Sequence, residues 1–383
     1  MGWQVIVFAA AFLVVMSADA GAQSTSDDGR SEAERTYQSY CATCHGADGM
    51  GEPGKQLYSI EIPDFTDCSF VTREPDADFF AVAHEGGPVR AFSAIMPAHG
   101  KTLGEEGIRA ALTHIRSFCS DARWPRGELN LPRPLFTEKA YPEDEAVITV
   151  DANANRERDV RVELLFEKRI GPKSQLEVAL PFRARGRPPG RGTSGGGGIG
   201  DVSVGVKHVL THSLERGSIA SLGAEVVFPS GDEDDGLGTG TTVFEPYLAG
   251  AQIFAEDGFL QAQLLGEIPA DRDRADAEVQ GRIALGWSVA QDRGFGRVFS
   301  PMLEFIGTGV LPKQGSNEFE ADLVPQLQVT LSRRQHIMLA AGVRVPLTET
   351  SERATRVVVY LLWDWFDGGL FEGWMLTPSG SDP

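Results

Sequence analysis

The sequence predicts two domains, a small all-α domain followed by an all-β domain that forms an antiparallel up-and-down barrel of about twelve strands. Three observations support this prediction. The chain has 383 residues, which is long for a single domain. Apolar residues recur at helical spacing up to residue 118, whereas they alternate with polar residues after residue 146. The connectors between the alternating runs are short and long in turn.

The charge balance excludes one class of partner. The chain has 35 Lys and Arg residues against 54 Asp and Glu residues, which gives a net charge of −19. Proteins bind phosphate backbones through clustered Lys and Arg side chains. We therefore expect no nucleic-acid partner.

The first residues predict export. Residues 5–16, VIVFAAAFLVVM, form an apolar run that is too short to cross a bilayer as a helix. Small residues follow in ADAGA (18–22), and a polar stretch after them disfavours the alternative of a buried N-terminal helix. The sequence therefore predicts a secretory signal peptide over residues 1–22 and an oxidising compartment for the mature chain. Residues 1–5 contain no Lys or Arg, which leaves the true start codon open.

A C-x-x-C-H motif follows the polar stretch, formed by Cys41, Cys44 and His45. This pattern is typical of haem c attachment. The two thiols add to the vinyl groups of the porphyrin, and the adjacent imidazole meets the iron from the same side. The motif predicts one covalent haem c, with Cys41 and Cys44 as anchors and His45 as the proximal ligand.

Two other kinds of site use a similar motif. A thioredoxin-like redox pair expects a βαβ context, but the residues before Cys41, EAERTYQSY, indicate a short helix. A zinc site needs two further ligands at regular spacing, and Cys68 is the lone cysteine nearby.

The sixth iron ligand is predicted to be Met96. Met50 follows His45 so closely that it should remain on the same side of the porphyrin. Met96 lies 51 residues after His45 (96 − 45), which is far enough for the chain to pass round the haem. Pro97 disfavours helix at Met96 and stiffens its loop. Methionine opposite histidine raises the reduction potential and closes the iron to small ligands.

Other residues remain candidates for that position. His84 and His99 are the alternative sixth ligands. Met96 would then be an ordinary core methionine. An iron without a sixth protein ligand would point to an enzyme rather than to an electron carrier.

A helix is predicted after Met96, because an acidic start is followed by apolar residues at helical spacing. These residues are Ile108, Ala111, Leu112, Ile115 and Phe118. The helix should pack on the N-terminal helix that carries Tyr37 and Tyr40.

With these motifs in order, residues 31–120 resemble a class I cytochrome c domain. The resemblance rests on Cys41, Cys44, His45, and on Met96 followed by Pro97 before the last helix. It implies a haem c held by these residues and a single-electron function.

Cys68 and Cys119 are a departure from this family pattern. The even number of four cysteines and the export signal favour a disulfide between them. Two buried free thiols are the alternative.

Residues 121–145 carry prolines at positions 125, 132, 134 and 142 and predict a stiff, extended linker. The predicted strands that follow are 146–152, 159–168, 174–183, 199–210, 218–228, 242–254, 258–268, 277–290, 296–308, 319–331, 335–347 and 354–366. A C-terminal tail over residues 367–383 ends the chain.

The strand pattern predicts an outer-membrane barrel over residues 146–366. Such barrels have an even number of strands, short periplasmic turns and longer outer loops. The second connector, GPK (171–173), is short, which agrees with a chain that enters the first strand from the periplasm. A soluble β-sandwich also alternates, but it does not require connectors that alternate in length.

The barrel segment resembles the transporter-like barrels associated with phenol-degradation (meta-pathway) operons. GIGD (198–201) before a strand and FPSGD (228–232) at a strand end carry this likeness. The order of the two domains also resembles the fused cytochrome–porins proposed for outer-membrane electron transfer.

The expected function follows from the sizes of the two domains. A domain of this length is about 30 Å across, whereas a twelve-strand barrel has a backbone diameter of about 25 Å, so the helical domain should lie at the periplasmic mouth. We expect a monohaem cytochrome that carries single electrons in the periplasm of a Gram-negative bacterium, tethered by the barrel. Its partners would be a periplasmic redox protein and outer-membrane lipid.

Two further functions stay open. The alternative is a transporter or porin whose haem domain senses or gates redox state. The third is an enzyme with an open haem, although no nucleophile or acid–base site stands out in the sequence.

Overall fold

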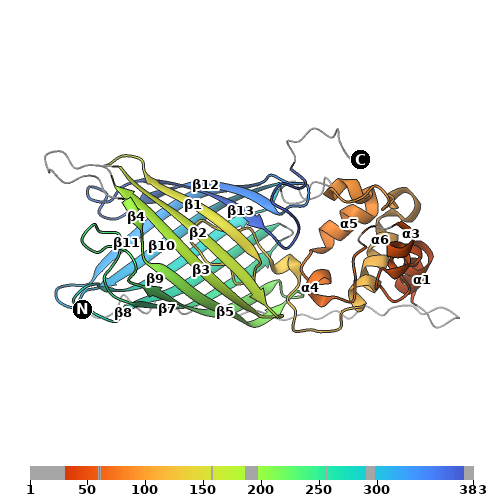
Figure 1. The fold of residues 1–383 in the computed structure, drawn as a ribbon, viewed down its shortest axis with the longest axis horizontal. Helices are drawn as coiled ribbons and strands as arrows, with labels where there is room; N and C mark the ends of the chain where they lie inside the picture. Colours follow the sequence, from red (N-terminus) through yellow and green to blue (C-terminus); the bar gives the residue numbers. More distant parts are fainter. Residues whose placement is uncertain are drawn as a thin grey trace.

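A computed structural model describes residues 31–58, 60, 62–156, 158–185, 197–255, 257–289 and 298–374. The predicted signal peptide and the last nine residues of the predicted tail lie outside the described residues (375–383 for the tail). In the described part of the chain, helices are followed by strands (Figure 1), which confirms the predicted order of a small helical domain and a β-barrel.

The helical domain (residues 31–120) is built from short helices around two longer ones. The helices are α1 (Glu32–Tyr40), α2 (Ala42–His45), α3 (Glu52–Tyr58), α4 (Cys68–Val71), α5 (Asp76–Glu85) and α6 (Gly100–Ser117), with a 3-10 turn η1 (Gly87–Arg90). The Ser31 side chain caps α1 by accepting a hydrogen bond from Glu34 N at 3.2 Å. Among the described residues, no helix is both long and apolar enough to cross a membrane.

The predicted packing of the N-terminal helix on the last helix is present. Helix α1 contacts α6, and Tyr37 of α1 is fully buried in a core with Ile108, Leu112 and Ile115 of α6. These residues follow one face of α6, so the helical spacing in the sequence correctly identified the buried side.

The second domain is a closed barrel. The strands are β1 (Glu145–Asn153), β2 (Asp159–Ile170), β3 (Ser174–Arg185), β4 (Gly197–Ile199), β5 (Val202–Ser213), β6 (Ser218–Phe228), β7 (Val243–Phe254), β8 (Gly258–Pro269), β9 (Ala277–Trp287), β10 (Phe299–Leu311), β11 (Glu318–Thr330), β12 (Ile337–Pro346) and β13 (Arg356–Asp364).

Every strand pairs antiparallel with its neighbours, and β1 closes the sheet by pairing with β13. The short β4 pairs with the C-terminal end of β3, and β5 pairs with the N-terminal part of β3. Together, β4 and β5 therefore form one strand of a barrel wall that has twelve strands. The prediction of a barrel is therefore confirmed, and the sandwich alternative is wrong because a sandwich leaves open sheet edges.

The two faces of the wall differ in chemistry. In β5, Ser203 and Lys207 face the lumen and are buried, whereas Val204 and Val206 face outward and are 39% and 57% exposed. Leu222, Phe244, Leu248, Leu264, Leu303, Phe319 and Leu327 extend this exposed apolar surface round the barrel. A closed barrel with an apolar exterior satisfies its backbone groups internally and suits hydrocarbon outside. The fold thus places the protein in the outer membrane, as predicted.

The helical domain lies at one end of the barrel, beside the ends of β2, β5 and β13 (Figure 1). This is the end of the short connector between β2 and β3, which faces the periplasm in outer-membrane barrels. The predicted position at the periplasmic mouth agrees with this arrangement.

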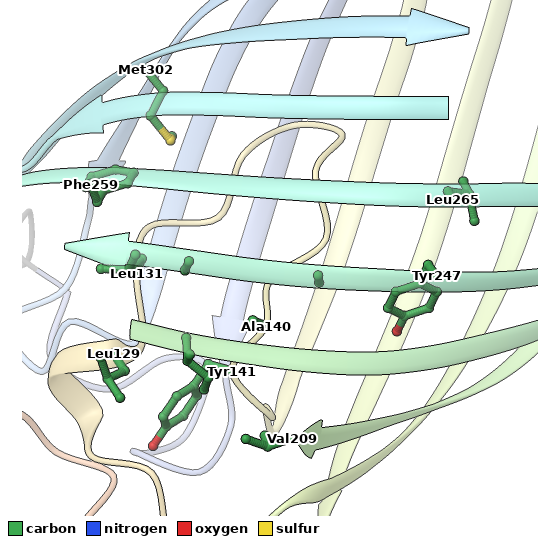
Figure 2. Packing of buried hydrophobic residues seen from close by; sticks show 12 residues of the cluster. Leu129, Leu131, Ala140, Tyr141, Val209, Tyr247, Phe259, Leu265 and Met302 are labelled. Carbon is green, nitrogen blue, oxygen red and sulfur yellow. The ribbon is translucent and has the colours of Figure 1, made fainter. Parts of the chain in front are cut away.

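The predicted linker runs through the barrel rather than only between the domains. After the 3-10 turn η2 (Gly127–Leu129), residues 129–141 enter the lumen, and Figure 2 shows this segment looping between the strands. Leu129, Leu131, Ala140 and Tyr141 are buried there against wall residues that include Phe259. We call residues 129–141 the lumen plug.

Candidate haem site and lumen plug

The cysteine motif forms one tight turn at the end of α1. Cys41 N donates to the Tyr37 carbonyl at 2.8 Å, and Cys44 N and His45 N donate to the Cys41 carbonyl at 3.2 and 3.0 Å. The Tyr37 hydroxyl donates to the Gly46 carbonyl at 2.8 Å and so fixes the far side of the turn. The turn therefore presents two half-buried free thiols and one imidazole from the same stretch of chain.

The raised pKa of the first thiol of the motif argues against a thioredoxin-like site. Burial raises the pKa of the Cys41 thiol to about 11, and the neighbouring Cys44 adds to this increase. A cysteine that exchanges disulfides instead has a lowered pKa. The motif also follows a helix rather than a strand. A zinc site is equally disfavoured, because Cys68 is bonded to Cys119 in the structure.

His45 has the properties of a metal ligand. Burial, and after it the charge of His99, lower the pKa of His45 to about 4, so its imidazole is neutral. Ligating histidines must be neutral. The His45 ring stacks on Phe65 at a centroid distance of 4.8 Å, and its Nδ1 atom is buried without a hydrogen-bond partner among the described residues. A buried polar atom without a partner is uncommon, and this set of donors fits an iron-bound haem c.

The loop that carries Met96 is fixed by backbone contacts. Gly87 N donates to the Met96 carbonyl at 3.0 Å, and His99 N donates to the Ala83 carbonyl at 2.9 Å. A Cβ atom at Gly87 would lie 2.2 Å from the Ser93 carbonyl oxygen, so glycine is required where the loop folds back. Met96 itself is half-buried.

The candidate histidines differ in their surroundings. His84 stacks on Phe80 at 5.5 Å, and its Nδ1 lies 2.7 Å from a Glu85 carboxylate oxygen. These contacts fix the orientation of the His84 ring. The charge of His99 acts on His45, as the pKa of His45 shows. His99 therefore remains an alternative to Met96.

Met50 lies in the loop that follows the motif. Gly51 N donates to the His45 carbonyl at 2.8 Å, so the loop that carries Met50 turns back onto the motif. The Met50 side chain is 44% exposed. A residue held beside His45 cannot reach the opposite face of a porphyrin that His45 binds.

The barrel rim contacts the loop that precedes Met96. The Arg334 guanidinium lies 4.7 Å from the centre of the Phe92 ring, and its Nη2 donates to the Ala91 carbonyl at 3.3 Å. The neighbouring Arg333 donates to the Pro88 carbonyl at 3.3 Å. The barrel thus supports the same loop that presents Met96.

A second contact joins the domains through Arg73. Its guanidinium forms a buried ion pair with Asp144 and lies 3.7 Å from the centre of the Phe366 ring. Arg73 follows α4, whose first residue, Cys68, is bonded to Cys119 at the end of α6, with Cα atoms 5.2 Å apart. The helical domain is therefore docked on the barrel rather than hanging from a free linker.

The lumen plug obtains its backbone hydrogen bonds from the wall. Arg133 N donates to Gln328 Oε1 at 3.0 Å, and Leu135 N donates to Gln326 Oε1 at 2.9 Å. Thr137 N donates to Glu304 at 2.6 Å. Three polar side chains that project from the wall into the lumen thus accept the hydrogen bonds that an extended chain would otherwise make to a neighbouring strand.

The charges of the plug are paired inside the barrel. The Arg133 side chain, 11% exposed, lies 2.6 Å from Glu145 and 2.8 Å from Glu167. Lys207, fully buried, lies 2.6 Å from Glu138 of the plug. Buried charges are tolerated when they are paired in this way.

Three carboxylates lie close together in the described part of the lumen. Oxygens of Glu138, Glu167 and Glu177 lie within 4.8 Å of one another. However, Lys207 and Arg133 already supply positive charge to Glu138 and Glu167.

The plug is the functional element that the sequence did not reveal. Two features of the sequence are consistent with a plug. The linker carries charged residues between its prolines, namely Arg133, Glu138 and Lys139. The polar faces of the predicted strands carry glutamines, namely Gln263, Gln326 and Gln328. A polar strand face predicts a lumen, but it does not tell whether water or chain fills it.

Two family models match separate parts of the chain. The family described as "Cytochrome C oxidase, cbb3-type, subunit III" matches residues 30–115. The family described as "Putative MetA-pathway of phenol degradation" matches residues 133–299, which include most of the plug. No curated protein matches the chain.

Among solved structures, the chain is similar to the KdgM porin in complex with disordered oligogalacturonate, with 9% identity, a TM-score of 0.37, and coverage of 57% of this chain and 98% of that one. It is similar to the NanC porin with 9% identity, a TM-score of 0.41, and coverage of 57% and 97%. The outer membrane phospholipase A from Escherichia coli gives 12% identity, a TM-score of 0.34, and coverage of 62% and 95%. At these values the likeness implies no shared function.

The matched ranges coincide with the helical domain and with the plug and most of the wall. The chain therefore joins an N-terminal cytochrome c domain to a β-barrel domain of the phenol-degradation family.

Proposed function

We propose that the protein is a monohaem c-type cytochrome that carries single electrons in the periplasm and is fixed to the outer membrane by its own barrel. The observation that carries this proposal is the turn of Cys41, Cys44 and His45, in which a buried neutral imidazole follows two thiols. The proposal extends the cytochrome family match of residues 30–115 to a specific role.

Each residue of the turn has a separate task. Cys41 and Cys44 would hold the haem through thioethers, and His45 would bind the iron from the near side. Tyr37, hydrogen-bonded to Gly46, keeps the turn in place. Phe65 covers the His45 ring and limits access of water. The bound haem supplies one-electron iron chemistry, whose potential depends on the axial ligands and the burial of the site.

Met96 is proposed as the sixth ligand. Its loop is fixed at Gly87 and supported by the barrel rim at Arg334. A thioether sulfur favours ferrous iron and fills the position to which carbon monoxide would otherwise bind. His99 is the competing ligand.

The barrel is proposed to act as a closed anchor. The plug occupies its lumen, and one haem at the periplasmic mouth cannot exchange electrons directly across a hydrocarbon layer about 25 Å thick. A periplasmic redox protein is therefore the proposed partner.

One observation favours the second candidate, a porin gated by the redox state of its haem domain. The start of the plug contacts that domain, because Gly127 N donates to the Thr72 carbonyl at 2.7 Å and Glu128 accepts from Asp76 N at 2.9 Å. A change in the helical domain could thus reach the plug. Conductance that changes on reduction would favour this candidate over the anchor.

Variants of the motif and of Met96 test the electron-carrier proposal. Cys44→Ala should lose most covalent haem staining on a denaturing gel. Met96→Ala should keep the staining, lower the reduction potential and gain carbon monoxide binding, whereas Met50→Ala should resemble the wild type. If Met96→Ala keeps the wild-type potential and does not bind carbon monoxide, Met96 is not the ligand, and His84→Ala and His99→Ala become the decisive variants.

A further inference from the structure

The outer half of the lumen contains a cavity that neither the cytochrome role nor the anchor role uses. It has a volume of about 210 Å³. Its lining residues are Arg161, Asp322, Arg344, Arg353, Ala354 and Arg356. They belong to the starts of β2, β11 and β13, the end of β12 and the loop between β12 and β13, which lies opposite the helical domain.

The lining carries more positive than negative charge. It contains four arginines and one carboxylate, that of Asp322. Arg344 and Arg353 both donate to the same Asp322 oxygen at 2.6 Å. Arg353 also donates to the Ala321 carbonyl at 3.2 Å. Among the described residues, Asp322 is the one carboxylate that Arg344 contacts, so most of the five N–H donors of Arg344 can meet another acceptor.

Arg161 is the least paired of the four. Its side chain is 53% exposed, and among the described residues the one carboxylate within 4.0 Å is that of Asp159, at 3.9 Å. Asp159 is already bound at both oxygens by Arg183 at 2.8 Å, and Arg356 also contacts it at 3.3 Å. Arg161 therefore faces its neighbouring arginines without a carboxylate of its own.

Two of the other arginines, Arg353 and Arg356, form ion pairs with nearby acidic residues. Arg356 donates to Asp151 at 2.6 Å, and Arg353 lies 3.0 Å from Glu320. These pairs hold the guanidinium groups in place around the cavity. A fixed group of guanidiniums recognises planar oxyanions better than a group that must first be ordered.

The plug closes the inner side of this cavity. The Arg344 guanidinium lies 5.1 Å from the centre of the Phe136 ring, at the tip of the plug. The opposite part of the wall, β6 to β9, carries the acidic residues Glu225, Glu245, Glu267 and Glu278 on its inner face. A ligand would therefore come from the outer side, where the arginines supply positive charge that attracts an anion.

We propose that this cavity binds a small organic anion that carries carboxylate groups. Carboxylates accept two parallel hydrogen bonds from one guanidinium, which matches several arginines around one space. Since one water occupies about 30 Å³, the cavity has room for about seven waters, which a small dicarboxylate could replace. The site does not depend on the haem and stands even if the electron-carrier proposal fails.

Calorimetric titration of the purified full-length holoprotein in detergent with succinate tests this site. We expect saturable binding to the wild type and at least a tenfold weaker affinity for Arg161→Gln. The contact of Arg161 with Asp159 is long, at 3.9 Å, and Arg183 binds that carboxylate at 2.8 Å. The Arg161→Gln variant should therefore fold, which heat-modifiable gel migration can verify. Arg161→Lys keeps the charge and should retain part of the affinity.

The matched control is Arg274→Gln, which removes the same charge from an outer loop where Arg274 contacts Glu233. Its affinity for succinate should equal that of the wild type. Inorganic phosphate serves as the second probe, and tighter binding of phosphate than of succinate would overturn the carboxylate assignment. No succinate binding tighter than about 10 mM, or equal affinity in folded Arg161→Gln, would overturn the site itself.

Discussion

The loop around Met96 and the lumen plug are both irregular segments stiffened by proline, but they are held in different ways. The Met96 loop is fixed by backbone bonds to residues nearby in the chain, such as Gly87 and Ala83. The plug is fixed by wall side chains such as Gln328 and Glu304, more than 150 residues away in sequence. The first is a local structure, and the proposed sixth ligand lies on it. The second exists only when the barrel has closed around it.

The plug contains buried ion pairs, so we expect the stability of the barrel around it to depend on them. Removing Arg133 takes the closest cation away from Glu145 and Glu167, which then keep only the longer contacts with Lys139 at 3.7 Å and Lys207 at 3.9 Å. Breaking a buried ion pair by removing one partner costs about 3–5 kcal/mol. Arg133→Ala should therefore lower the free energy of unfolding of the barrel by about this amount. Urea unfolding followed by the loss of heat-modifiable migration measures this change.

The control for this variant is Arg123→Ala. Arg123 pairs with Asp121 at 2.8 Å, but its side chain is 72% exposed and outside the lumen. We expect no measurable change in barrel stability. Equal effects of the two substitutions would mean that the plug is not held by its buried charges.

The helical domain should depend instead on its covalent link between α4 and α6. Cys68 and Cys119 are separated by 51 residues, and a disulfide that closes a loop of this size contributes about 2–4 kcal/mol. The double variant Cys68→Ala, Cys119→Ala should lower the melting temperature of this domain and leave the barrel unchanged. Mass spectrometry of a non-reduced digest should find the two peptides joined. Two alkylatable thiols in the native wild type would show that the pair is not bonded.

The smallest expected effect concerns the contact between the two regions. Glu74 lines a narrow cavity with Asp78, Asp364 and Asp367. Burial, and then the charges of Asp78 and Asp364, raise the pKa of Glu74 from 4.5 to about 8, and the charge of Glu74 in turn helps to raise the pKa of Asp367. Between pH 4.5 and about pH 8, the folded state therefore binds more protons than the unfolded state.

The docked interface should consequently be most stable at mildly acidic pH and weaken as the pH rises from 4.5 towards 8. Glu74→Gln is neutral throughout and should flatten this dependence, whereas Glu106→Gln on the exposed part of α6 should not. Thermal unfolding of the helical domain at a series of pH values measures the slope. An unchanged slope in Glu74→Gln would assign it to other groups.

The parts of the structure that could be predicted are those with a short-range signal. The alternation of Val204 and Val206 with Ser203 and Lys207 fixes which face of β5 is apolar, and the same rule repeated over twelve segments predicts a barrel. The C-x-x-C-H motif is confined to five consecutive residues, so its chemistry is visible without the fold.

The plug and the docking of the domains have no such signal. The bond from Arg133 to Gln328 spans 195 residues, and the ion pair of Arg73 and Asp144 spans 71. Prolines in the linker indicate an extended chain, but extension alone does not decide whether the chain lies outside or inside a closed wall. The arginines around the outer cavity likewise come from strands that meet only when β1 pairs with β13.

If the plug makes the barrel a closed anchor for a periplasmic electron carrier, the protein should not conduct ions. The most direct measurement is the conductance of the purified holoprotein in planar bilayers, recorded with the haem oxidised and then reduced. We expect no channels in either state, and stable channels when residues 130–140 are replaced by a Gly-Ser segment of equal length. Stable channels in the wild type would contradict the closed anchor, and channels that appear only on changing the redox state would establish the gated porin instead.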